Sequence, residues 1–300
     1  MAIKISFINF KGGVAKTTLS VNFAATLAKR EYKTLLVDLD PQSNASLWLL
    51  GADRFLARLR EPTKTVYQLF LDRIPHISQG HLKFSFSDAV VKAVAKDRRG
   101  YSVTPHLDLL PQTFEAIDLE HHLTASNAPN YDILKKGLED IEHSYEYIIF
   151  DCAPNLYLVT INALLFSDYY IIPVYPDYFA RAGLTILTRQ IKKILDRYSG
   201  YIGNTPELLG VVITRIKEGA TLDVGRKTDL ESGLHDLKRE GIISPNAVVF
   251  ETYFNDTVEV PRSIERFIPS IYHKTSYSPM KEYIDRMERF TDDVLSRIRR

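Results

Sequence analysis

The chain has 300 residues, of which 45% are hydrophobic and 25% are charged, as in an ordinary globular protein. Its 38 Lys and Arg nearly cancel its 37 Asp and Glu, which excludes a polycation that coats nucleic acid through its overall charge. A single cysteine, Cys152, excludes a disulfide framework and a cysteine-based zinc or iron–sulfur centre within one chain, and it favours the cytosol.

The predicted elements alternate between strands and helices. An apolar run at 3–10 predicts a strand, and apolar residues at helical spacing in 17–29 predict a helix. Further strands are predicted at 34–38, 107–111, 147–151, 169–175 and 208–214, and further helices at 130–142, 181–197 and 223–239. This alternation predicts an α/β fold in which helices cover both faces of a mostly parallel, twisted sheet.

Two segments differ from this rhythm. Residues 52–106 show few clear strands, and we interpret them as helical or irregular additions to the core. Residues 279–299 repeat apolar side chains every three or four positions, from Tyr283 to Ile298, which predicts an amphipathic helix. We expect residues 1–300 to form one domain.

The segment FKGGVAKTT (10–18) has the form of a phosphate-binding loop, although Phe10 and Ala15 occupy positions where the usual pattern G-x-x-x-x-G-K-[ST] has glycine. It lies between a predicted strand and a predicted helix, where backbone N–H groups and the helix N-terminus bind phosphate. In such a loop Lys16 reaches the β- and γ-phosphates, and the Thr17 hydroxyl is placed to ligate Mg²⁺. The alternative is a chance Gly-Lys-Thr turn.

Three aspartates lie at or just after the ends of predicted strands. VDLDPQSN (37–44) contains Asp38 and Asp40, and YIIFDCAP (147–154) contains Asp151. The carboxyl ends of parallel strands form the ligand-binding edge of an open α/β sheet. A lone acidic strand end usually marks a solvated loop, but an aspartate after four apolar residues, as at Asp151, is typical of the Mg²⁺-supporting residue of P-loop ATPases. Together with the loop, these residues predict a nucleotide site.

The segments KGGVAKTT, LLVDLDPQSN and IIFDCAP resemble the deviant Walker A ATPases of the ParA/MinD superfamily, and most closely its ParA-type partition branch. The likeness continues through 162–184 and, more loosely, in 211–215 and 260–270. It implies a single P-loop NTPase domain, ATP and Mg²⁺ as cofactors, and slow, partner-stimulated hydrolysis of ATP to ADP and phosphate. Because the loop begins at residue 11, we expect no N-terminal helix-turn-helix domain.

The resemblance also implies roles for individual residues. The nucleotide is bound by Lys11, Gly12, Gly13, Val14, Ala15, Lys16, Thr17 and Thr18, and its base is contacted by Arg215, Pro261 and Arg262, for which a plain loop role is the alternative. Mg²⁺ is held by Thr17, Asp38 and Asp151. Lys11, Lys16 and Asp40 are catalytic: Asp40 orients or deprotonates the attacking water, and Lys11 reaches the partner's ATP across a homodimer interface. The alternative for Lys11 is a solvent-facing lysine.

Ala15 departs from the family, which generally has glycine there. If Ala15 needs a positive φ, its Cβ costs about 1 kcal/mol and crowds the phosphates, whereas a negative φ makes alanine nearly harmless. Because Gly12, Gly13 and Lys16 are retained, we expect ATP binding to persist. The effect on the rate of hydrolysis stays open.

By the same resemblance, the ATP dimer binds DNA without sequence preference, and an adaptor protein stimulates hydrolysis. Such cycles position a cargo over the nucleoid, which is a plasmid, a chromosome or a protein organelle such as a carboxysome. The protein is then cytoplasmic, and nucleoid-associated in its ATP state. Candidate DNA-binding residues are Lys281, Arg286, Arg289, Arg297, Arg299 and Arg300, with Lys192, Lys193 and Arg197 on an earlier helix. A solvated helix face is the alternative for each.

Two other functions are alternatives to this one. A MinD-like membrane switch would insert the C-terminal helix in lipid, but acidic residues such as Asp285 dilute its basic face, and packing on its own sheet is the better explanation of the apolar stripe. An iron–sulfur scaffold or nitrogenase-type reductase needs paired cysteines, whereas Cys152 is ordinary as a buried thiol. With no signal peptide and no run of 18 apolar residues, we expect no stable membrane insertion.

Overall fold

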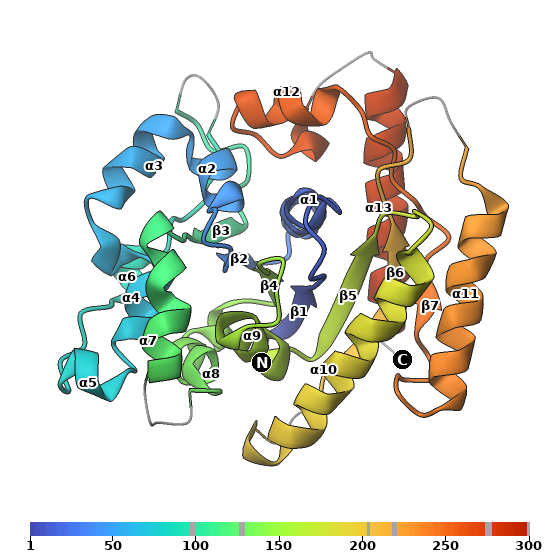
Figure 1. Cartoon of the computed structure of the whole chain (residues 1–300). Helices are drawn as coiled ribbons and strands as arrows, with labels where there is room; N and C mark the ends of the chain where they lie inside the picture. The colour runs from blue at the N-terminus through green and yellow to red at the C-terminus, as the bar shows by residue number, and fades with distance from the viewer. Residues whose placement is uncertain (97–99, 126–129, 203–204, 218–220, 274–277, 299–300) are drawn as a thin grey trace.

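The computed structural model describes residues 1–96, 100–125, 130–202, 205–217, 221–273 and 278–298, which form one central sheet between layers of helices (Figure 1). The strands are β1 (Ile3–Phe7), β2 (Thr34–Asp38), β3 (Leu107–Leu110), β4 (Tyr147–Asp151), β5 (Tyr169–Val174), β6 (Glu207–Ile213) and β7 (Val248–Val249). Their order is β3-β2-β4-β1-β5-β6-β7, and each of these neighbouring pairs is parallel. The predicted parallel α/β sheet is therefore confirmed.

The α-helices of the described residues are α1 (Lys16–Lys29), α2 (Asn44–Leu50), α3 (Ala52–Leu59), α4 (Val66–Leu71), α5 (Pro75–Ser78), α6 (Phe86–Ala89), α7 (Leu119–Ala125), α8 (Ile133–Leu138), α9 (Leu158–Phe166), α10 (Ala180–Ile202), α11 (Val224–Arg239), α12 (Glu259–Glu265) and α13 (Ser278–Ile298). Short 3₁₀ turns are η1 (Pro62–Lys64), η2 (Phe114–Asp118), η3 (Glu142–Ser144) and η4 (Ser270–Tyr272). The helix predicted at 130–142 is confined to α8, which contains the poor helix former Gly137 near its end. Sequence reasoning predicted neither α9, α12 nor β7.

Each face of the sheet has its own hydrophobic core. Along β4, Ile148 and Phe150 pack into one core and Ile149 into the other, because successive strand residues point to opposite faces. Helices α9, α10 and α11 cover the first core, and α1, α2 and α13 cover the second. In Figure 1, α10 accordingly lies in front of the sheet and α13 behind it. Covering both faces explains why the strand sequences are almost continuously apolar.

The described part of the segment 52–106 (residues 52–96 and 100–106) wraps around the β3 edge of the sheet, on the left of Figure 1. Phe70 packs into one core and Phe55 into the other, so the segment contributes to both faces. Val91 exchanges backbone hydrogen bonds with Leu109 of β3, at 2.8 and 3.0 Å, in an isolated antiparallel bridge. The segment therefore covers a strand edge that would otherwise offer unpaired backbone groups.

The strand order brings the predicted motifs together. Strand β4 lies between β1 and β2, and Asp151 at its end pairs in register with Phe7 of β1 and with Asp38 of β2. The chain turns to opposite sides of β1 in its two halves, which makes the carboxyl edge of β1 a topological switch point. The phosphate loop and the aspartates therefore meet at the edge where open α/β sheets bind ligands.

Candidate nucleotide site at the carboxyl edge of the sheet

The phosphate loop joins β1 to α1, as predicted, and Ala15 precedes the first residue of the helix. Ala15 has φ 61° and ψ 31°, in the left-handed region. Of the two alternatives for this residue, the positive φ is therefore the one that the structure adopts, at a cost of about 1 kcal/mol relative to glycine. The loop has a glycine-type conformation at a position that lacks glycine.

Lys16 lies inside the loop. It is 7% exposed, and its Nζ donates a hydrogen bond to the carbonyl of Lys11 at 3.3 Å, so the loop curls around the ammonium group. Burial lowers the pKa of Lys16, while the nearby carboxylates of Asp151 and Asp40 favour its charged form. No ion pair occupies this ammonium among the described residues, so it is placed to meet an anionic ligand.

Asp38 and Asp40 are buried at the end of β2. Oδ2 of Asp38 accepts hydrogen bonds from the backbone N–H of Ser46 at 2.8 Å and from its hydroxyl at 2.6 Å. Burial and then the charge of Asp151 raise the pKa of Asp38. Asp40 accepts from the N–H of Gln42 at 2.9 Å, and burial raises its pKa as well. The buried carboxyl groups of Asp38 and Asp40 therefore lie together at the carboxyl edge of the sheet, where ionising them is costly unless a cation binds beside them.

Asp151 is fully buried, and neither of its oxygens has a well-aligned hydrogen bond among the described residues. Burial raises its pKa, although the hydroxyls of Thr17 and Ser20 lie near enough to favour the charged form. A buried, orphaned carboxylate beside a threonine hydroxyl at a phosphate loop fits Mg²⁺, which takes hard oxygen ligands. Asp38, opposite in register, is held in place by Ser46.

Lys11 points away from this cradle. Its side chain is 46% exposed, and its Nζ forms an ion pair and hydrogen bond with Asp177, in the turn between β5 and α10. Its backbone N–H donates to Oδ1 of Asn9 at 2.9 Å, which orients the start of the loop. Two lysines five residues apart on one loop thus face opposite environments, one enclosed and one at the surface.

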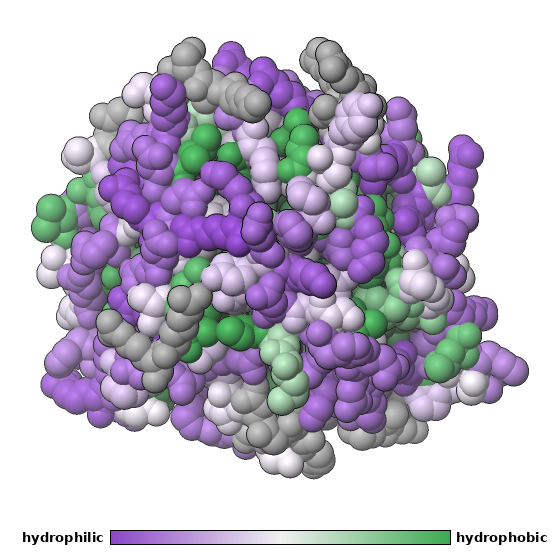
Figure 2. All heavy atoms as spheres, turned by 180° about the vertical axis from the view of Figure 1, so that it is seen from behind, coloured by the Kyte–Doolittle hydropathy of each residue, from purple (hydrophilic) through white to green (hydrophobic). Residues whose placement is uncertain are grey.

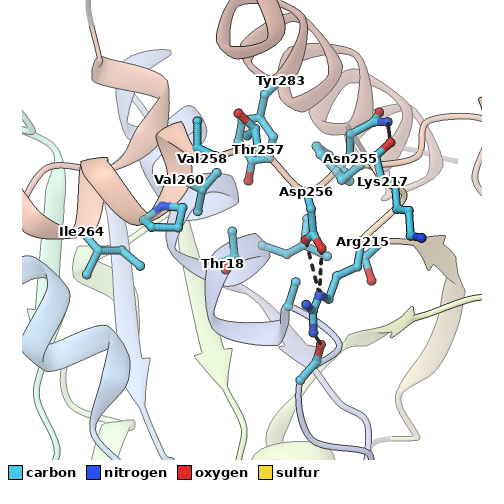
Figure 3. Close-up of a pocket in the computed structure, with 16 residues that line it drawn as sticks. Thr18, Arg215, Lys217, Asn255, Asp256, Thr257, Val258, Val260, Ile264 and Tyr283 are labelled. Atoms are coloured by element: carbon cyan, nitrogen blue, oxygen red, sulfur yellow. Dashed lines mark hydrogen bonds and ion pairs between the residues drawn. The ribbon is translucent and has the colours of Figure 1, made fainter. Parts of the chain in front are cut away.

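A pocket of about 650 Å³ opens beside the loop (Figure 3). Its lining includes Gly13, Ala15 and Thr18 from the loop and α1, Arg215 after β6, and Pro261 of α12. Its position next to the loop suits the rest of a nucleotide whose phosphates occupy the cradle. Arg215 and Pro261, predicted to contact the base, thus line this pocket.

Arg262 lies elsewhere. It is not among the lining residues of the pocket, and its guanidinium forms an ion pair with Glu259 in the same helix, α12. Among the other loop residues, Val14 is buried, whereas Gly12 is exposed. A role for Arg262 in nucleotide binding stays a prediction that requires this pair to open.

The predicted DNA-binding residues of α13 divide into two groups. Lys281 and Arg289 are exposed. Arg286 is only 12% exposed in its side chain, donates to the carbonyl of Tyr253 at 2.7 Å and pairs with Glu282, while Arg297 pairs with Asp293 at 2.8 Å. Arg299 and Arg300 lie outside the described residues. On α10, Lys193 and Arg197 are exposed, whereas Lys192 pairs with Asp196.

The apolar stripe of α13 is buried against the protein itself. Phe290 packs edge-to-face with Phe23 of α1 and with Phe250, at ring-centroid distances of 5.8 and 5.0 Å. The surface in Figure 2 is mostly hydrophilic, with hydrophobic residues in small separate groups. No helix in the described part of the chain is long and apolar enough to cross a membrane. The burial of the α13 stripe against the protein's own core does not favour the MinD-like alternative.

Sequence reasoning missed three residues that shape this site: Ser46, Asp177 and Asp256. Ser46 fixes Asp38, Asp177 holds Lys11, and Asp256 pairs with Arg215. Asp177 lies in the segment PVYPDYF, two residues after the predicted strand at 169–175, which is the same spacing as that of Asp40 after the strand at 34–38. Ser46 and Asp256 carry no such signal, because their partners are defined only by packing.

Comparison with known proteins agrees with this geometry. Residues 2–202 match the family model described as an AAA domain. The sporulation initiation inhibitor protein Soj of Bacillus subtilis is 30% identical over 247 residues, covering 82% of this chain and 86% of that protein. The chromosome partitioning protein ParA of Caulobacter vibrioides is 29% identical over 249 residues, covering 82% of each.

Solved structures show the same fold. Apo McdA of Cyanothece superposes with a TM-score of 0.68 at 17% identity, covering 98% of this chain and all of that one (100%). A cobyrinic acid a,c-diamide synthase of Mycobacterium smegmatis, solved with an ATP analogue and magnesium, gives a TM-score of 0.58 at 24% identity, covering 80% and 82%. The ligands of that neighbour agree with the prediction of ATP and Mg²⁺.

The family model covers more than half of the chain, and the match to Soj reaches 30% identity over most of both proteins. The loop, the strand-end aspartates and the strand order independently point to the same family. The chain therefore belongs to the ParA/MinD superfamily of P-loop ATPases, on its ParA-type partition branch.

Proposed function

We propose that the protein is an ATP-dependent dimerising switch that binds DNA without sequence preference in its ATP state and positions or partitions a cargo. An adaptor protein couples it to that cargo and stimulates hydrolysis. The observation that carries the proposal is the opposed placement of two lysines on one phosphate loop: Lys16 is enclosed in the cradle, and Lys11 projects to the surface. One serves the nucleotide of its own chain, and the other is available to a second chain.

Within one chain, the residues divide the work of phosphoryl transfer. Bound ATP–Mg²⁺ supplies the transferable phosphoryl group and the metal charge that neutralises its oxygens. Lys16 and the loop N–H groups bind the phosphates, and Thr17, Asp38 and Asp151 would hold the metal. Asp38 would act through water, because Ser46 already bonds to one of its oxygens and the backbone N–H of Asp40 to the other. Asp40 orients the attacking water.

A second copy of this chain fits the surface around Lys11. Large apolar side chains gather there: Phe10, Tyr175, Tyr178, Phe179 and Ile186. Tyr178 is 80% exposed and Phe179 is 67% exposed, and their rings stack edge-to-face at 5.1 Å. One pocket of about 250 Å³ is lined by Lys11, Phe10, Tyr175, Phe179 and Ile186, among other residues. Exposed aromatic groups of this kind are typical of protein interfaces.

The ion pair with Asp177 then holds the Lys11 ammonium group against its own chain until dimerisation. Exposed ion pairs contribute little net free energy, so a nucleotide phosphate across the interface competes effectively for the ammonium group. The contact therefore permits the switch to operate at a small energetic cost.

DNA binding in the ATP state relies on clustered basic residues, doubled by the dimer. Lys281 and Arg289 of α13 and Lys193 and Arg197 of α10 are the exposed candidates. Contacts from such residues to DNA phosphates are independent of sequence and sensitive to salt. In its ATP state the protein then associates with the nucleoid. Its cargo is a plasmid, a chromosome or a protein organelle such as a carboxysome.

The test is binding of the purified protein to a random-sequence DNA duplex without nucleotide, with ADP–Mg²⁺ and with ATP–Mg²⁺, each at two salt concentrations. We expect binding only with ATP, and weaker binding at the higher salt. Equal binding in all three nucleotide states, or none in any, contradicts the proposed switch on DNA. Light scattering on the same samples separates failure to dimerise from failure to bind DNA.

A further inference from the structure

Two side chains that follow β6 hold neighbouring carbonyls of the phosphate loop. The hydroxyl of Thr214 donates to the carbonyl of Val14 at 3.1 Å, and Nη1 of Arg215 donates to the carbonyl of Gly13 at 2.9 Å. Thr214 is fully buried, whereas Arg215 lines the pocket beside the loop. Both carbonyls lie just before Ala15, so the loop is held immediately before its left-handed alanine.

The backbone at Arg215 is constrained as well. Arg215 has φ 61°, which is uncommon for a residue other than glycine. The next residue, Ile216, donates its N–H to the carbonyl of Phe254 at 3.1 Å and accepts from the N–H of Asp256 at 2.7 Å. Strained conformations persist where the surrounding structure determines them, and they concentrate at functional sites.

The same guanidinium contacts a second residue that lines the pocket, Asp256. Nε of Arg215 lies 3.3 Å from each carboxylate oxygen of Asp256, and Figure 3 shows the two side chains in direct contact where both line the pocket. Both partners are about half exposed, so this pair is a weak source of stability. Its effect is to orient the guanidinium, whose fixed fork then presents Nη1 to the loop.

We propose that Arg215 is a positioning residue for the phosphate loop. Its hydrogen bond to the carbonyl of Gly13 keeps Ala15 in the left-handed conformation that glycine would adopt readily. Its ion pair with Asp256 connects the loop conformation to the residues that line the pocket. The inference rests on the nucleotide-binding function proposed above. It gives Arg215 a role through the loop backbone, in addition to the predicted contact with the base.

The alanine makes this role specific. Glycine at position 15 adopts the left-handed conformation about as readily as the right-handed one, whereas alanine needs external contacts to populate it. Arg215→Ala should therefore weaken nucleotide binding strongly when residue 15 is alanine. It should weaken binding less when residue 15 is glycine.

The experiment measures the Kd of a fluorescent ATP analogue with Mg²⁺ for the wild-type chain, Arg215→Ala, Ala15→Gly and the double variant. We expect Arg215→Ala to weaken binding about tenfold, the factor that corresponds to about 1.4 kcal/mol. In the Ala15→Gly background, the same substitution should weaken binding by only about threefold. Equal losses in both backgrounds, or no loss in either, would overturn the proposal.

Further variants separate positioning from folding. Arg215→Lys keeps the charge but loses the fork and should give an intermediate Kd, and Asp256→Asn should give a smaller loss. Arg239→Ala removes an arginine from a surface pair with Asp236, at 3.5 Å on α11, and serves as the control with unchanged Kd. If Arg215→Ala does not fold, a wild-type Kd for Arg215→Lys contradicts the proposal. If the wild-type chain itself binds no nucleotide, the proposed function fails instead.

Discussion

The carboxyl edge of β1, β2 and β4 and the C-terminal helix α13 both carry charged residues predicted to act on a ligand, but they hold them in opposite ways. At the edge, Lys16, Asp38 and Asp151 are buried, and both oxygens of Asp151 lack a well-aligned partner among the described residues. On α13, Arg286 and Arg297 are satisfied by acids one turn away in the same helix.

The difference teaches how far a charge in a sequence can be trusted as a functional signal. Burying a charge without a partner is expensive, so such a group persists where a ligand completes it. A charge on a helix surface finds a local partner at little cost, and its presence therefore carries little information. We expect substitutions at the edge to change chemistry and assembly, and substitutions on α13 to divide between stability and DNA binding.

The largest effect is expected at Asp40. Asp40→Ala should lower adaptor-stimulated ATP turnover by at least about 100-fold, because the attacking water loses its orienting carboxylate. ATP binding should persist, so the variant should accumulate as an ATP-bound dimer. Phosphate release and light scattering measure the two quantities, and Asp53→Ala on the exposed surface of α3 is the matched control. Unchanged turnover in Asp40→Ala would show that Asp40 does not orient the water.

The next largest effect concerns Lys11. Lys11→Ala should weaken ATP-dependent dimerisation by about tenfold or more, because it removes a charge-assisted contact across the interface. Nucleotide binding by the monomer should change little, since Lys16 remains. Asp177→Asn should act in the opposite direction by releasing Lys11. Analytical ultracentrifugation with ATP tests both variants. Equal dimerisation of Lys11→Ala and wild type would contradict the homodimer in which Lys11 reaches the partner's ATP.

A smaller effect follows from the raised pKa of Asp38 and Asp151. Because their pKa values are raised, the carboxyl groups of Asp38 and Asp151 bind protons more tightly in the folded state than in the unfolded chain. Their contribution to the free energy of unfolding is therefore present near the unfolded pKa of about 4 and is lost as pH rises toward the raised folded pKa. Urea unfolding of the nucleotide-free protein should therefore show a loss of about 1 kcal/mol or more between about pH 5 and pH 8. Asp38→Asn should flatten this slope, and a stability that rises with pH would contradict the interpretation.

The smallest effects are expected on α13. Arg286→Ala should lower the free energy of unfolding by about 1 kcal/mol, because Arg286 covers the ring of Tyr253 at 3.9 Å and donates to its carbonyl. The pair Lys281→Ala and Arg289→Ala should leave unfolding unchanged and weaken ATP-dependent DNA binding severalfold, with a shallower salt dependence. Filter binding and thermal unfolding distinguish these outcomes. If the two surface substitutions leave DNA binding intact, DNA binds elsewhere.

Much of the fold could be predicted from the sequence, because buried parallel strands and amphipathic helices each have a characteristic local pattern of apolar residues. Strand β7 is only two residues long, and α9 is apolar nearly all round, so neither shows the periodicity on which the prediction relied. The site was predicted where motif residues lie at strand ends. It was missed at Ser46, which bonds to Asp38 eight positions before it, and at Asp177 and Asp256, whose partners are distant in the chain.

By itself, the sequence determined that a phosphate loop and three aspartates meet at one edge of a parallel sheet, since loop position and strand ends follow from local pattern. Only the tertiary structure decided that Ala15 is left-handed, that Arg215 and Thr214 hold the loop, and that Lys11 rests on Asp177. Backbone angles in a loop and the choice of ion-pair partner depend on groups that folding brings together from distant segments. A local sequence pattern therefore cannot predict these angles or partners.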